Sequence, residues 1–142
     1  MKLAVLAGLI VLTGCTRPLF GGGGVEGTDV GMSRDVPAPR GQVYERAYRW
    51  LQGSHNYRIV QTVTNQSIRA ENVLGNGGIN VIHATFSGGN LSTRVTVDAW
   101  TDIVGEGGGR RRADLYDGRL PLEVDAFFAN LSCQIARWPD CP

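Results

Sequence analysis

The feature that most constrains this fold is the alternation of apolar and polar side chains from Arg94 to Ala99, within the predicted strand Leu91 to Val104. Val95, Val97 and Ala99 would lie on one face of a β-strand, and the polar residues between them would lie on the other face. Such alternation is typical of an antiparallel sheet that is covered on one side only. We therefore expect a sheet with one packed face and one open face.

The surrounding sequence predicts the remaining elements. Runs rich in β-branched residues predict strands at 57–64, 67–73 and 79–86, and Asn65-Gln66 predicts the hairpin turn between the first two. Apolar residues at helical spacing predict a helix at 42–52 and a second helix that begins near Pro121. The expected fold class is α+β, a two-layer sandwich in which a four-stranded antiparallel sheet carries two helices in the order α-β-β-β-β-α.

The first fourteen residues have the features of a signal peptide. Met1 and Lys2 are followed by an apolar run from Leu3 to Leu12, which is too short to cross a bilayer as a permanent helix. The run ends in Leu12-Thr13-Gly14-Cys15, which resembles the lipobox of bacterial lipoproteins. This resemblance implies cleavage before Cys15 and attachment of acyl chains to its sulfur, so that the membrane itself is a partner.

The resemblance also implies a location. An aspartate after the lipidated cysteine tends to retain lipoproteins at the inner membrane of Gram-negative cells, and here that position is Thr16. We expect an anchor in the cell envelope, at the periplasmic face of the outer membrane if the organism is Gram-negative. Residues 15–40 are rich in glycine and proline and predict a lipidated, flexible tether, which leaves 41–142 as the folded domain.

Cysteine content and charge narrow the choice of partners. With Cys15 lipidated, Cys133 and Cys141 lie close in sequence in an exported chain, so we expect a disulfide between them. A redox or metal role is the alternative, but there is no CxxC motif or nearby histidine to support it.

Lys2 is the only lysine, so 13 arginines balance 13 acidic residues after cleavage, and no nucleic-acid partner is expected.

The sequence contains no evident catalytic group. Ser54 and His55 are adjacent, which rarely gives the geometry of a nucleophile and its base, and His83 lies within a predicted strand. Asp98 and Asp102 share a strand face, which supplies neither a glycosidase cleft nor the dense oxygen ligands of a calcium loop. We expect no catalytic residues, no metal site and no cofactor.

One local feature suggests a contact surface. Arg110, Arg111 and Arg112 follow the glycine-rich stretch 105–109, and on a mobile loop they could meet an envelope protein or an anionic envelope component such as lipid phosphate. A solvated hairpin loop is the alternative interpretation. Trp100 is predicted on the open face with Asp98, where it is a candidate contact residue unless the tether covers it.

The element order behind the lipobox resembles the helix-grip domains of small envelope lipoproteins, such as the C component of the outer-membrane β-barrel assembly machinery. The likeness covers about residues 40–138 and includes the phrases Tyr44-Glu45-Arg46-Ala47 and Ser92-Thr93-Arg94-Val95-Thr96-Val97. It implies a fold and brings no catalytic motif. Our hypothesis is a non-catalytic binding or scaffolding role. The alternatives are a small-ligand binder with a groove between helix and sheet, and an enzyme that acts on cell-wall or lipid substrates.

Overall fold

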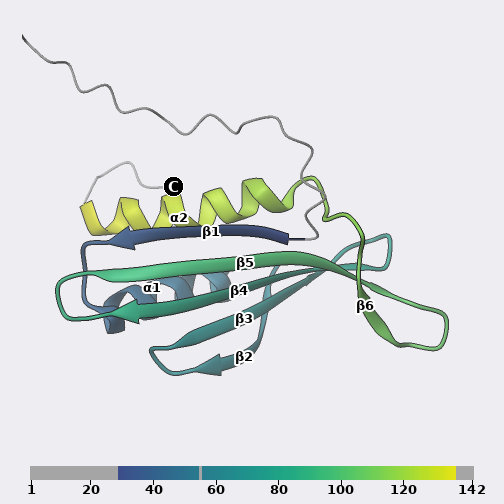
Figure 1. The fold of residues 1–142 in the computed structure, drawn as a ribbon, viewed down its shortest axis with the longest axis horizontal. Helices are drawn as coiled ribbons and strands as arrows, with labels where there is room; N and C mark the ends of the chain where they lie inside the picture. The colour runs from purple at the N-terminus through teal and green to yellow at the C-terminus, as the bar shows by residue number, and fades with distance from the viewer. Residues whose placement is uncertain (1–28, 55, 137–142) are drawn as a thin grey trace, which may run out of the picture.

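The computed structural model describes residues 29–54 and 56–136. They form one antiparallel sheet of six strands and two helices, so the predicted α+β class is confirmed (Figure 1). The elements are β1 (Asp29–Val36), α1 (Arg40–Gly53), β2 (Arg58–Val63), β3 (Ser67–Val73), β4 (Gly78–Gly88), β5 (Thr93–Val104), β6 (Arg110–Arg112) and α2 (Leu120–Ala136). The strand order is β1-β5-β4-β3-β2, and β6 pairs with β5.

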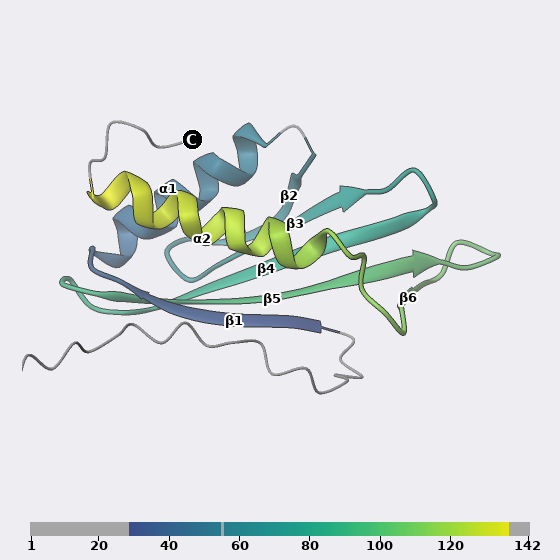
Figure 2. The ribbon, with the colours of Figure 1, turned by 90° about the horizontal axis from the view of Figure 1, so that it is seen from above.

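Both helices lie on the same face of the sheet, as predicted (Figure 2). The inward positions of β4 and β5 are opposite one another, with Ile82 beside Ala99 and Ala84 beside Val97, and all four side chains are fully buried. The helices cover them with residues at helical spacing, which are Val43, Ala47 and Leu51 from α1 and Val124, Phe127, Phe128 and Leu131 from α2. The predicted apolar face of the sheet is therefore the core.

The predicted count of four strands is wrong, because β1 and β6 also belong to the sheet. The predicted tether includes Asp29–Val36, yet this segment pairs with β5 from Asp29 opposite Trp100 to Val36 opposite Thr93. Its sequence, DVGMSRDV, contains a glycine and four polar residues, so its intrinsic preference for a strand is weak. Pairing with a long neighbouring strand outweighs this preference.

Side chains on both faces hold β1 in place. Val30 and Met32 pack against the core, and Val36 is buried in it. On the open face, Ser33 and Thr96 share a hydrogen bond of 2.8 Å between their hydroxyl oxygens. The tether prediction is therefore wrong for residues 29–36.

A partly buried hydrogen bond fixes the start of α2 against the loop after α1. The Tyr57 hydroxyl donates to Oε2 of Glu123, which lies in the first turn of α2. Burial raises the pKa of Tyr57 far above its ordinary value, and the bond to Glu123 raises it further. The phenol therefore stays protonated and keeps its role as donor.

Several predicted features lie outside the described residues. They include the signal peptide, the lipobox with Cys15, and Cys141, so lipidation and the Cys133–Cys141 disulfide stay predictions. No helix within 29–54 or 56–136 is long and apolar enough to span a membrane.

Candidate partner-binding surface on the open face of the sheet

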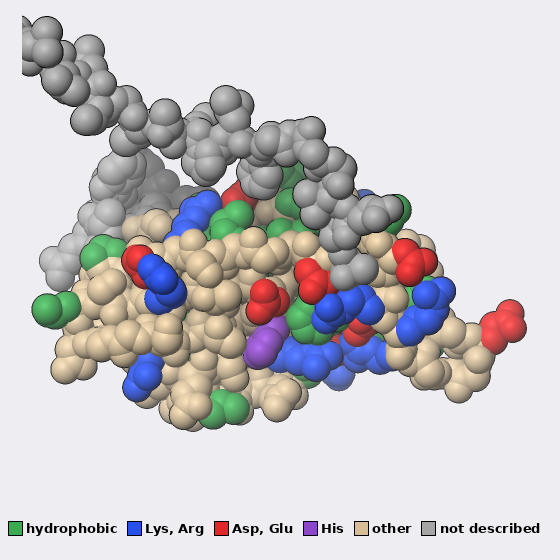
Figure 3. All heavy atoms as spheres, in the orientation of Figure 1, with side chains coloured by type: hydrophobic (Ala, Val, Ile, Leu, Met, Phe, Trp, Pro, Cys, Tyr) green, Lys and Arg blue, Asp and Glu red, His purple; other side chains and the backbone are tan. Residues whose placement is uncertain are grey.

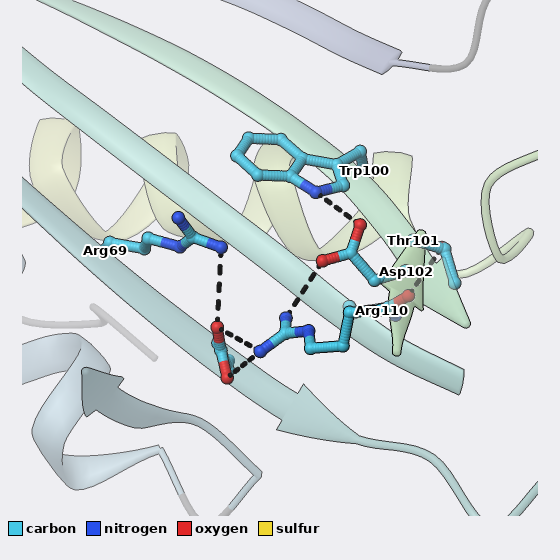
Figure 4. Close-up of polar contacts among 7 residues, drawn as sticks. Arg69, Trp100, Thr101, Asp102 and Arg110 are labelled. Atoms are coloured by element: carbon cyan, nitrogen blue, oxygen red, sulfur yellow. Dashed lines mark hydrogen bonds and ion pairs between the residues drawn. The ribbon is translucent and has the colours of Figure 1, made fainter. Parts of the chain in front are cut away.

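Trp100 lies on the open face near the end of β5, where three side chains hold its indole ring. Its Nε1 donates a hydrogen bond of 2.9 Å to Oδ1 of Asp102, so the prediction that both residues share this face is confirmed (Figure 4). The guanidinium carbons of Arg112 and Arg69 lie 4.4 and 5.5 Å from the ring centroid, within the range of cation–π attraction. The ring is therefore fixed before any partner arrives.

A chain of ion pairs continues from Asp102 across the sheet. Arg110 reaches Oδ2 of Asp102 at 2.9 Å and Oε1 of Glu71 at 3.0 Å, and Glu71 also receives Arg69 at 3.6 Å (Figure 4). The two carboxylates are well shielded, with side-chain exposures of 11% for Asp102 and 12% for Glu71. Partial desolvation lowers the pKa of Arg110, but the hydrogen bonds to Asp102 and Glu71 outweigh it and raise that pKa overall.

The side chains around Trp100 cover apolar residues on the open face of the sheet, which carries no helix. Val81 lies opposite Trp100, and Ile79 lies opposite Asp102, so both project from the open face. Even so, Val81 is fully buried and Ile79 is nearly so. Because long arginine side chains can cover apolar surface with their methylene groups, these residues form a small second core with the indole ring. We call this assembly of Arg69, Glu71, Val81, Trp100, Asp102, Arg110 and Arg112 the Trp100 cluster.

The prediction of a mobile loop is wrong for the three arginines, which form the short strand β6. Arg110 and Arg112 lie opposite Val104 and Asp102 in the register with β5, and β4 occupies the other edge of β5 at this point. β6 therefore pairs with the same edge of β5 as β1 does. β1 covers this edge as far as Trp100, and β6 covers it from Asp102 onward. Arg112 joins the two segments, since its Nη1 lies 2.9 Å from both carboxylate oxygens of Asp29.

The alternation of β6 separates the three arginines. Trp100, Arg110 and Arg112 come together on the open face, but Arg111 projects from the opposite side. Arg111 is exposed and has no ion pair within 29–54 or 56–136. The predicted contact set is therefore brought together only in part.

Sequence reasoning missed Arg69, Glu71 and Asp29. The first two alternate within a predicted strand, so their shared face could have been found. Their position beside Trp100 depends on the register of three strands, which the sequence does not show. Asp29 was missed because its strand was assigned to the tether.

The charges of this surface balance. Three guanidinium groups, from Arg69, Arg110 and Arg112, meet three carboxylates, from Asp29, Glu71 and Asp102. Figure 3 shows acidic and basic side chains interspersed on this face. A surface of this kind suits a partner of mixed charge better than a polyanion, because its arginines are already paired.

The two residues His83 and Asp98 lie together on the open face, apart from the hollows described for this structure. His83 lies opposite Asp98 on the open face, but it lines none of the hollows along α1, around Tyr57, or between β1 and α2. No group of three or more metal-ligating side chains occurs in 29–54 or 56–136. No family model matches the chain, and no curated protein sequence matches it.

Replacing Asp102 with Asn should destabilise the domain measurably. Asp102→Asn removes the charge that Arg110 meets in a shielded site, and we expect a loss of about 1 to 3 kcal/mol in the free energy of unfolding. Urea denaturation followed by tryptophan fluorescence measures it.

The matched control is Asp35→Asn on the same face. Asp35 pairs with Arg94 through two hydrogen bonds of 2.9 and 2.8 Å, but both side chains are more than half exposed. The loss in the free energy of unfolding should be much smaller for Asp35→Asn, because water screens exposed ion pairs. Equal losses for the two variants would show that the Trp100 cluster is no more than an ordinary surface pair.

Proposed function

We propose that this protein is a membrane-anchored envelope lipoprotein with a non-catalytic binding or scaffolding role, and that its open sheet face binds an envelope protein. The observation that carries the proposal is the Trp100 cluster, in which a partly exposed indole is held between paired arginines on a face without helices. Tryptophan and arginine are among the residues most enriched where binding energy concentrates at protein interfaces.

The rigidity of the cluster supports a binding role. Trp100 and Arg110 each bond to Asp102, so a partner would not have to order these long side chains itself. Side chains that are held before binding lose less entropy in the complex. The balanced charges support a protein partner with its own mixed charges, and they give less support to an anionic polymer.

The alternatives have weaker support. A small ligand between helices and sheet would need open space there, but Leu51, Phe127 and Phe128 fill that interior and are fully buried. An enzyme would need a cleft with a base and a partner group, and His83 lines none of the four hollows described above. The lipid anchor itself rests on the signal and lipobox residues up to Cys15, and the outer-membrane location rests on Thr16.

The anchor can be tested by metabolic labelling. Cells that express the full chain and are fed an alkyne fatty acid should yield a labelled protein, and Cys15→Ser should abolish the label because the acceptor sulfur is gone. Fluorescence of the clicked product on a gel measures it. Label that persists in Cys15→Ser would rule out lipidation at this residue.

The binding face can be tested by photo-crosslinking in intact cells. A p-benzoylphenylalanine in place of Asp98, which is exposed on the open face, should give a discrete crosslinked product. The same amino acid in place of Arg49, which is exposed on the outer side of α1, serves as the control and should not give that product.

A second substitution links the product to the cluster. Adding Trp100→Ala to the Asp98 probe should weaken the product about tenfold or more, as expected for loss of a central aromatic contact. Identical products from positions 98 and 49, or a product that Trp100→Ala leaves unchanged, would contradict binding through this face.

A further inference from the structure

We propose that the end of the domain where the tether joins it docks on a phospholipid bilayer surface through Leu115 and Leu122. This inference rests on the proposed lipid anchor, because the anchor brings this end to the membrane. It is independent of the Trp100 cluster as a protein-binding face. It assigns a second surface to the domain, with lipid as its partner.

The first argument is where the tether ends. β1 begins at Asp29 at the same end of the sheet as the β3–β4 turn, the β5–β6 hairpin and the start of α2 (Figure 1). The chain takes 14 steps from Cys15 to Asp29, which span at most about 50 Å when fully extended. A lipid on Cys15 therefore keeps this end of the domain near the headgroups at high effective concentration.

The second argument is the placement of exposed apolar side chains. Leu115 and Leu122 are 74% and 70% exposed, although they lie beside residues that pack well. Tyr116 and Pro121, their neighbours in sequence, line one hollow of about 330 Å³ together with Val30 and Met32 near the start of β1. The sequence neighbours of both leucines therefore line one hollow beside the start of β1, and Asp29 and Asp125 line it too.

Val73 ends β3 and Val104 ends β5, both at the tether end, with exposures of 74% and 49%. Leu91, at 88%, lies in the turn between β4 and β5 at the opposite end, and Val60 and Val63 in β2 are less exposed, at 39% and 43%. Four of the seven large apolar side chains that are exposed in the described residues therefore lie at the tether end. Exposed apolar residues at one end mark a contact surface, and the tether selects a membrane as the partner.

The third argument is charge. The segment from Arg110 to Leu122 contains four arginines and two aspartates, and Arg111 and Arg119 are exposed without an ion pair in the described part of the chain. Asp117 is engaged, because its carboxylate accepts the backbone N–H of Arg119 at 2.9 Å. Asp114 and Glu106 are exposed and oppose the arginines, so apolar contact contributes more than charge does.

The surface is held rigidly to the sheet. Thr101 donates a hydrogen bond of 2.8 Å to Asn80 and accepts one of 2.8 Å from the backbone N–H of Asp117. The N–H of Ala113 donates to the carbonyl of Thr101 at 2.8 Å. The leucines are therefore presented on a loop and helix start whose positions are already fixed.

The test uses hydrogen–deuterium exchange on vesicles. The mature chain, with Cys15→Ser and an N-terminal hexahistidine tag, is held on vesicles of phosphatidylethanolamine, phosphatidylglycerol and a small fraction of nickel-chelating lipid. Compared with the same protein in solution, amides of residues 113–123 should exchange about threefold or more slowly. Since the tag supplies the anchor, this result does not depend on lipidation, which fatty-acid labelling tests separately.

Two variants make the test specific. Leu115→Ser with Leu122→Ser should remove the slowing, and Leu91→Ser, which changes a similarly exposed leucine at the other end, should retain it. All three substitutions are at exposed sites, and thermal unfolding checks that each variant is folded. Exchange that is unchanged on vesicles, slowing that the double variant retains, or slowing centred on Leu91 would each overturn the proposal.

Discussion

The outer edge of β5 is the constraint on which the rest of the structure depends. β5 runs from Thr93 to Val104, and β4 pairs with it over almost its whole length. Its other edge would expose a row of unpaired backbone groups, which is costly and invites aggregation. β1 covers this edge as far as Trp100, β6 covers it from Asp102 onward, and the ion pair between Asp29 and Arg112 joins them.

Closing this edge determines the character of the open face. It places Arg110 and Arg112 where Asp102, Glu71 and Asp29 neutralise them, so a run of arginines becomes part of a balanced cluster around Trp100. It also brings the start of β1, and with it the tether, to the end of the domain where α2 begins (Figure 2). In this account one end of the domain faces the membrane, and the adjoining sheet face is free to bind a protein.

The sequence predicted those elements whose signals are local. Both helices and β5 follow from apolar periodicity, and β2 to β4 follow from runs of β-branched residues. Asn65, in the predicted turn between β2 and β3, has a positive φ of 58°. β1 and β6 could not be predicted in this way. Each is stabilised by pairing with β5, and the paired residues of β1 and β5 are 57 to 71 positions apart in sequence. A glycine-containing segment or three arginines carry no strand signal. Trp100 could be placed on its face, but its partners required the register.

The position of β1 tests this account most directly, because it fixes the closed edge, the arginine cluster and the entry point of the tether together. In solution NMR, nuclear Overhauser effects should link Met32 with Val97 and Gly31 with Asp98, as the antiparallel register requires. The sharp, averaged amide signals of a flexible chain across residues 29–36, without these cross-strand effects, would contradict the account.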